Sequence, residues 1–128
     1  MLNRVILMGR LVKDPVLRYT QSLKPVASFT IAVERDYAER GQDRATDFVD
    51  CVSWNGTANF IHQHFDKGNM IAVAGRLQFR EWTDRDGNKR RNAEILVENA
   101  YFADSKKTTD AVKPAPSELE EASGELPF

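Results

Sequence analysis

Apolar and polar residues alternate along most of the first hundred positions, as they do in strands with one buried face. The longest such stretch runs from Met70 to Phe102 and is interrupted only by Asp84-Arg85-Asp86-Gly87-Asn88. These five residues favour a tight turn, because Gly, Asn and Asp tolerate a positive φ. On the returning segment Ala93, Ile95 and Val97 share one face. The pattern predicts a long β-hairpin, made of residues 70–83 and 89–102, as the element with which the other segments pair.

Three further segments alternate in the same way, and one segment has helical spacing. The predicted strands cover residues 3–12, 28–35 and 47–54, and the predicted helix covers residues 57–65. The segments 16–24 and 36–46 are polar or broken by proline, which predicts an irregular connection and a loop. A small sheet with so little helix must close on itself or form a sandwich, and five strands with a helix after the third favour the closed form. The order therefore predicts an all-β fold: a five-stranded OB-type barrel with one short helix between strands three and four.

Residues 105–128 differ in composition from the rest of the chain. They are rich in Ser, Thr, Ala, Pro and Glu and contain no aromatic residue except the last, Phe128. Such a segment cannot form a core, which predicts one domain over residues 1–104 followed by a disordered acidic tail. The tail ends in Glu125-Leu126-Pro127-Phe128, an apolar cluster behind acidic spacers. This ending suits capture in a shallow apolar pocket with a basic rim, although a chance ending is the alternative.

The charge distribution bears on the kind of partner. The chain holds 18 Lys and Arg against 19 Asp and Glu. Three of the basic and five of the acidic residues lie in residues 105–128, which leaves 15 basic and 14 acidic residues in residues 1–104. Such a balanced domain disfavours binding to a polyanion by charge alone.

Catalytic and metal-binding patterns find little support. Cys51 is the single cysteine, and His62 and His64 are two apart on the predicted helix, so they face different directions. No Walker loop or Gly-x-Ser-x-Gly motif is present, and the carboxylates are scattered. The chain also lacks a leader and an apolar run of about 18 residues. These observations predict a cytoplasmic binding protein, not an enzyme, without metal or cofactor.

Basic and aromatic residues are interleaved around the tip of the predicted hairpin. They are Arg76, Phe79, Arg80, Trp82, Arg85, Lys89, Arg90 and Arg91. Long basic side chains beside aromatic rings suit single-stranded nucleic acid, whose phosphates and bases they can contact together. The competing interpretation is an edge hairpin kept soluble by its charges.

Four aromatic residues are candidates for base stacking: Tyr37, Phe48, Trp54 and Trp82. Phe48 and Trp54 share one face of their predicted strand with Asp50, which is unusual for a core face. If the opposite face packs inside, both rings are presented to solvent, where large aromatic residues favour a partner. The alternative buries both rings as ordinary core.

Several ordered motifs resemble those of the bacterial and phage single-stranded DNA-binding proteins. The resemblance covers residues 1–103 and the last few residues. Its carriers are Leu2-Asn3-Arg4-Val5-Ile6-Leu7-Met8-Gly9-Arg10-Leu11, Asp14-Pro15, Arg18-Tyr19-Thr20, Val26 to Val33, Asp47 to Trp54, Lys67-Gly68, Val73 to Leu77, Trp82-Thr83-Asp84 with Gly87, and the terminal Leu-Pro-Phe.

The resemblance implies an OB fold, a homotetramer around which single strands wrap, and a nucleoid-associated protein. It also implies that the terminal peptide recruits replication, recombination and repair enzymes. By position, Tyr37, Phe48, Trp54 and Trp82 match the family's stacking residues. The matching phosphate contacts are Arg4, Arg10, Arg35, Arg76, Arg80, Lys89 and Arg90. The first strand is the family's pairing strand, which implies an oligomer interface at Asn3, Val5 and Leu7.

The sequence departs from the family pattern in two places. The family usually has a Gly in the turn after Arg-Tyr-Thr, where this chain has Gln21-Ser22-Leu23-Lys24-Pro25. The family's consecutive Asp residues before the apolar end are replaced here by Gly124-Glu125. Two other functions stay open: an OB-fold RNA-binding or primosomal accessory module, and an adaptor whose sheet contacts only proteins.

Overall fold

The computed structural model describes residues 1–104, which form a barrel of six strands and one helix. The elements are β1 (Val5–Leu11), β2 (Val16–Tyr19), β3 (Pro25–Glu34), β4 (Thr46–Trp54), α1 (Asn55–His64), β5 (Met70–Thr83) and β6 (Lys89–Phe102). The predicted limits of the long hairpin are confirmed, and so is the single short helix before it.

The strands form one sheet in the order β1-β5-β6-β4-β3-β2, which closes where β1 pairs with β3. The closing pairs are Arg10 with Ala32 and Leu11 with Ile31. All neighbours run antiparallel except β4 and β6, which are parallel through Cys51 and Ile95. This closed all-β architecture confirms the predicted fold class.

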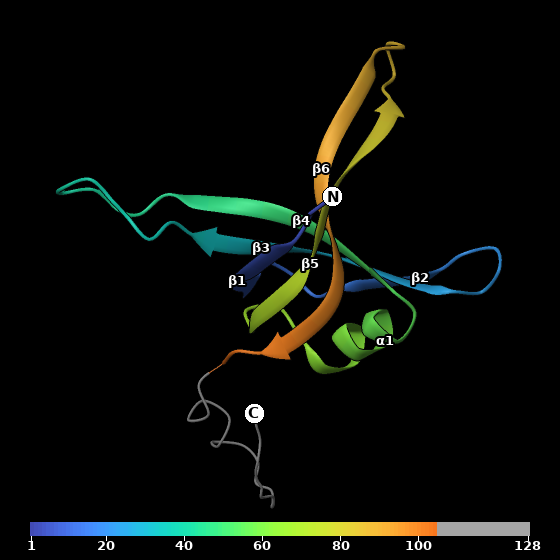
Figure 1. Cartoon of the computed structure of the whole chain (residues 1–128), viewed down its shortest axis with the longest axis horizontal. Coiled ribbons are helices and arrows are strands. Elements are labelled where there is room, and N and C mark those ends of the chain that lie inside the picture. The colour runs from blue at the N-terminus through green and yellow to red at the C-terminus, as the bar shows by residue number, and fades with distance from the viewer. Residues whose placement is uncertain (105–128) are drawn as a thin grey trace, which may run out of the picture.

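Alternate residues of each strand fill the barrel. Phe29, Ile31 and Cys51 are buried, as are Ile95 and Val97 from β6. Helix α1 adds Ile61 to the same core, with Phe65 directly after the helix, and Figure 1 shows α1 at the lower end of the barrel. Burial of these faces is the main force that closes the sheet.

Three segments, which we call ribbons, project from the barrel (Figure 1): the end of the β5–β6 hairpin, the loop between β3 and β4, and the loop between β2 and β3. Within β5 the change from barrel to ribbon is sharp. Residues 71–75 are largely buried, whereas most residues from Arg76 onward are exposed. A bulge lies at this boundary, between Ala74 and Gly75.

One connection that the sequence predicts as irregular is a strand. Residues 16–19 form β2, which pairs antiparallel with β3 from Val16 opposite Ser28 to Tyr19 opposite Pro25. The strand is four residues long and only Leu17 is half-buried, so it has too few positions for alternation to be recognised. Pro25 is tolerated because it is the first residue of its strand. The sheet therefore has six strands, of which the five longer ones were predicted.

The start of helix α1 and the turn between β2 and β3 also differ from the expected patterns. Helix α1 begins two residues early, with Trp54 as its N-cap and no side-chain cap bond. The hydroxyl of Thr57, in the first turn, donates to the Glu98 carbonyl at 3.2 Å. In the turn between β2 and β3, where the family usually has a Gly, Leu23 adopts a φ of +64°.

Within residues 1–104, no helix has the length and apolarity needed to cross a membrane.

Candidate nucleic-acid interface

Three of the four predicted stacking residues lie on one face of the sheet, which we call the outer face. Leu96 of β6 pairs with Arg76 of β5 on one side and with Val52 of β4 on the other, so these three residues point the same way. Counting by twos along each strand places Trp82 on this face with Phe48 and Trp54. Their exposed fractions are 45%, 68% and 41%. This exposure excludes the alternative in which Phe48 and Trp54 form ordinary core.

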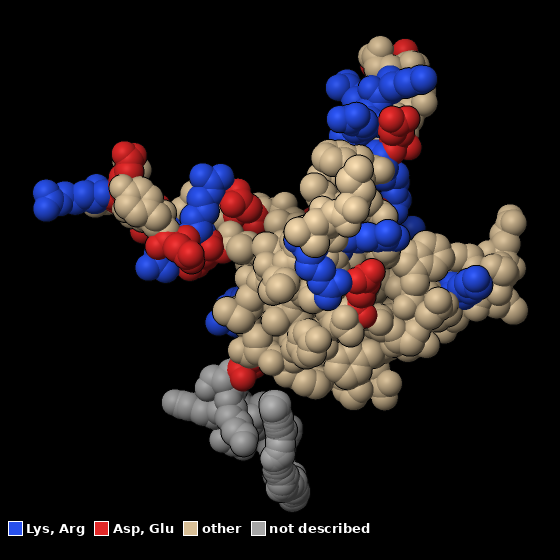
Figure 2. Space-filling view, viewed as in Figure 1, with Lys and Arg blue, Asp and Glu red and all other residues tan. Residues whose placement is uncertain are grey.

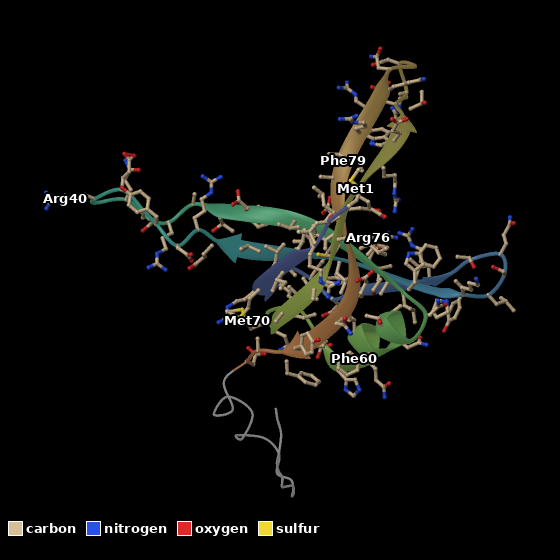
Figure 3. All side chains as sticks on the ribbon, viewed as in Figure 1. Met1, Arg40, Phe60, Met70, Arg76 and Phe79 are labelled. Atoms are coloured by element: carbon tan, nitrogen blue, oxygen red, sulfur yellow. The ribbon has the colours of Figure 1, made fainter. Side chains whose placement is uncertain are left out.

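The fourth stacking candidate, Tyr37, lies outside the strands. It belongs to the loop between β3 and β4 and is 75% exposed. Figure 3 shows Arg40 at the outermost tip of the same loop. Tyr37 is therefore carried on a ribbon separate from the one that carries Trp82.

Most of the predicted phosphate contacts already face a carboxylate. Five of the seven basic residues have such a partner: Arg4 with Glu98 at 2.6 Å, Arg10 with Asp104 at 3.8 Å, Arg35 with Asp47 at 3.0 Å, Arg80 with Glu94 at 3.2 Å and Arg90 with Asp84 at 2.9 Å. Figure 2 shows Lys and Arg atoms over the β5–β6 hairpin and the β3–β4 loop, with Asp or Glu atoms beside them. The basic character of this surface is thus local and largely balanced, in agreement with the charge count.

Arg76 and Lys89 differ from the other five. Within residues 1–104 neither makes an ion pair or a side-chain hydrogen bond. Arg76 lies at the base of the projecting hairpin (Figure 3) and Lys89 is the first residue of β6. Their charges are available to a phosphate without the loss of an internal partner.

The ion pairs shift pKa values in the expected directions. The hydrogen bonds from Arg35 hold the pKa of Asp47 below its ordinary value, and the same contacts raise the pKa of Arg35. At the hairpin tip, the amide of Asn88 and the guanidinium of Arg90 both donate to Asp84 and lower its pKa. Asp84 thereby shapes the turn next to Trp82.

Arg10 lies near Phe48 but far from Trp82. Arg10 and Phe48 both pair with Ala32, one from each neighbouring strand, so they share a face. Arg10 also pairs with Met70 at the start of β5, whereas Trp82 is close to the end of that strand. Twelve residues of extended chain separate the two positions by about 40 Å along the strand. The guanidinium donates to the Gly68 carbonyl at 3.0 Å. A phosphate contact at Arg10 stays a prediction, on a part of the surface distant from the hairpin tip.

The side chains of the predicted interface residues Asn3, Val5 and Leu7 contact the rest of their own chain. The Asn3 side chain exchanges two hydrogen bonds with the backbone of Leu77, and Val5 and Leu7 are half-buried against the core. The apolar residues that β1 presents to solvent are Ile6 and Met8, exposed by 74% and 57%. Both lie within the segment from Asn3 to Met8 that the resemblance implies as interface, and the alternation that places Val5 and Leu7 inside places them outside.

The hairpin carries a second aromatic surface that sequence reasoning did not separate from the first. Phe79 pairs with Ala93 on the face opposite Trp82 and is 56% exposed. The guanidinium of Arg91 lies 5.1 Å from the centre of its ring, within the range of a cation–π contact.

The described side chains that could serve as nucleophiles, acid–base groups or metal ligands do not form a site. Burial raises the pKa of the Cys51 thiol to about 12, so the thiol is unreactive at neutral pH. His62 and His64 are exposed, and His64 packs against the rings of Phe60 and Phe102. In the part of the chain that the structure describes, no three His, Cys, Asp or Glu residues gather as metal ligands would.

The predicted tail residues Glu125, Leu126, Pro127 and Phe128 lie outside the described residues.

The chain is similar to known proteins over most of its length. A family model described as the Single-strand binding protein family matches residues 2–103. A "Single-stranded DNA-binding protein" of Caldanaerobacter subterraneus is 42% identical over 106 residues, which cover 83% of this chain and 71% of that protein. The protein of the same name from Bacillus cereus is 44% identical over 102 residues, 80% of this chain and 60% of that one. "Single-stranded DNA-binding protein A" of Bacillus subtilis is 41% identical, over 83% of this chain and 62% of its own length.

The match includes the barrel and the strands that carry Phe48, Trp54 and Trp82. Several of these relatives are longer, so the chain spans about 60% of their length. On the extent of the match and the level of identity, the chain belongs to the Single-strand binding protein family.

Proposed function

We propose that this protein binds single-stranded DNA without sequence specificity and protects it. The observation that carries the proposal is the outer face, where Phe48, Trp54 and Trp82 are exposed beside basic side chains. The relatives are named as single-stranded DNA-binding proteins. Members of this family bind DNA and are not enzymes, which confirms the prediction of a non-enzymatic chain.

Binding combines two contributions. Bases stack on the exposed rings, a contact that tolerates any sequence because every base has a π-face. Phosphates contact the basic residues of the ribbons, among which Arg76 and Lys89 have no competing partner within the described chain. Because residues 1–104 hold nearly equal numbers of acidic and basic residues, stacking supplies a large share of the affinity.

The protein acts in replication, recombination and repair, in the cytoplasm and in association with the nucleoid. Its terminal Glu125-Leu126-Pro127-Phe128 recruits enzymes of these processes. Support for this part comes from the composition of the tail, in which an apolar peptide follows acidic spacers, and from the family.

The protein is a homotetramer in this proposal. Between Val5 and Gly9 one side of β1 pairs with β5, and β1 meets β3 only at Arg10 and Leu11. A second copy can add its own strand at this free edge, in the manner of β-augmentation. Ile6 and Met8 give the same strand an exposed apolar face.

Tryptophan fluorescence tests the binding, since Trp54 and Trp82 are the two tryptophans and both lie on the outer face. We expect saturable quenching by poly-dT, weak quenching by poly-rU and little by duplex DNA, with most of the signal surviving high salt. Stronger quenching by poly-rU would favour an RNA-binding module. No quenching by any nucleic acid would contradict the proposal and favour an adaptor.

Deletion of residues 126–128 tests the tail. The truncated chain is expected to keep its affinity for poly-dT while losing capture of replication and repair enzymes. A truncated chain that captures the same enzymes as the full chain would contradict the role of the tail.

A further inference from the structure

A hollow of about 300 Å³ opens on the outer face, between β2 and the base of the β5–β6 hairpin. Its charged lining comes from five residues: Lys13, Arg18, Asp50, Arg80 and Glu94. Ser28, Thr30 and Asn92 add neutral polar groups. Val16 and Val52 add apolar wall. The volume is at the lower end of the range of small-molecule sites, about 300–1,000 Å³.

The two carboxylates in the hollow differ in how they are occupied. Glu94 accepts from Gln78 at 2.7 Å and from Arg80 at 3.2 Å, and its side chain is 13% exposed. Asp50 accepts one bond, from the Thr30 hydroxyl to Oδ1 at 3.0 Å. Within residues 1–104 its Oδ2 has no hydrogen-bond donor, so the hollow presents one free, charged acceptor.

The hollow lies among the stacking residues. Asp50 is two residues from Phe48 and four from Trp54 on the same face of β4, and Arg80 is two residues from Trp82 on β5. The unpaired Oδ2 of Asp50 repels phosphate, whereas Lys13 and Arg18 attract it. A strand whose backbone is held by Lys13 and Arg18 can therefore turn a base toward Asp50.

We propose that this hollow is a subsite for one base and that Asp50 makes it prefer bases with an exocyclic amino group. Cytosine and adenine carry such a donor on the edge where thymine and uracil carry a carbonyl oxygen. An amino group donates to Oδ2, whereas a carbonyl oxygen meets a second acceptor there. The inference rests on the proposed single-strand binding and adds a base preference at one position.

The test compares oligo-dC with oligo-dT, two pyrimidine strands of the same length, on the wild-type protein and on Asp50→Asn. The asparagine keeps the acceptor for Thr30 but offers an amide donor in place of Oδ2, so it accepts thymine. We expect the ratio of the dT to the dC dissociation constant to fall by about fivefold, the size of one hydrogen bond. Loss of a negative charge also strengthens binding to both oligomers, and the ratio removes this shared effect.

Asp47→Asn is the matched control, because Asp47 is on the same strand and its carboxylate faces Arg35, away from the hollow. It is expected to leave the dT to dC ratio unchanged. An equal change of the ratio in both variants, or an unchanged ratio in Asp50→Asn, would overturn the base preference while single-strand binding stands. A wild-type protein that binds neither oligomer would overturn the proposed function together with this inference.

Discussion

Arg35 and Asp47 are joined by two parallel hydrogen bonds, from Nε to Oδ2 and from Nη2 to Oδ1, each 3.0 Å long. They lie at the base of the β3–β4 loop, where the Arg35 amide also donates to the Ala45 carbonyl. A phosphate that approaches the Nε–Nη2 edge of Arg35 has to replace this carboxylate. The pair therefore holds a predicted binding residue in place and competes for it.

Asp47→Asn is expected to tighten binding to poly-dT at low salt by about threefold, because the exposed carboxylate that competes for Arg35 is removed and exposed ion pairs are weak. The measurement is a fluorescence titration at two salt concentrations. Asp36→Asn is the control, since it removes a carboxylate from the same loop without a bond to Arg35. An equal gain from Asp36→Asn would assign the effect to net charge alone.

Trp82→Ala is expected to cost about 1–3 kcal/mol of oligonucleotide affinity, the usual value of a stacked base. Phe79→Ala is the matched control, because Phe79 has a similar exposure on the same strand but faces the opposite way. Its affinity should stay near that of the wild type. Equal losses in the two variants would show that the hairpin does not bind through one face.

Leu23→Gly is expected to stabilise the domain by about 0.5–1 kcal/mol. The left-handed φ of Leu23 costs roughly 1–2 kcal/mol, part of which the entropy of glycine offsets. Little packing is lost, since the side chain is 77% exposed. Thermal unfolding measures the change, and Leu23→Ala, which keeps the strained conformation, should show no gain. A Leu23→Gly variant less stable than the wild type would contradict the backbone strain at Leu23.

Substitution by alanine is expected to change stability in opposite directions at two glycines, Gly75 and Gly56. A Cβ at Gly75 would strike the carbonyl group of Leu96, which is backbone and cannot swing aside. Gly75→Ala should therefore cost about 2 kcal/mol or more. A Cβ at Gly56 meets nothing within 4 Å, so Gly56→Ala should stabilise α1 by about 0.5–1 kcal/mol. Urea denaturation of both variants measures the contrast, and equal effects would contradict the close approach at the bulge.

Burial of Cys51 should make stability depend on alkaline pH. Its pKa is raised from 9.0 to about 12, first by burial and then by the carboxylates of Asp50 and Glu94. The unfolded chain releases this proton first, so the stabilising contribution is complete below pH 9 and declines toward pH 12. Relative to Cys51→Ala, the free energy of unfolding should fall by about 1 kcal/mol between pH 9 and 10. Parallel pH profiles for the two proteins would contradict the shift.

Sequence patterns predicted the long elements, in which apolar and polar residues alternate over many positions. The β5–β6 hairpin was predicted with its observed limits, because fourteen residues on each side alternate around a turn in which Gly87 has a φ of +84°. Strand β2 was missed because it has four residues and depends on β3 for its hydrogen bonds. The helix start was placed too late because Trp54 serves as N-cap without a side-chain bond.

The site was predictable in residue type and less so in arrangement. Alternation alone shows that Phe48 and Trp54 share a face, but only the parallel pairing of β4 with β6 brings them onto the face of Trp82. The ion pairs were beyond sequence reasoning for the same reason. Arg4 and Glu98 are 94 residues apart, and no local pattern links them.

The division of β5 between barrel and ribbon has a consequence for local stability. Residues 71–75 lie in a closed sheet above a core, whereas residues 76–83 have a single neighbouring strand and solvent on both faces. Two-stranded ribbons are only marginally stable in water. Backbone amides of one continuous strand should therefore exchange with deuterium at very different rates, slowly at Val73 and quickly at Trp82. A ligand bound to the outer face of the hairpin should slow exchange mainly at the amides of residues 76–83. Amide exchange along β5 therefore shows which part of the strand the ligand contacts.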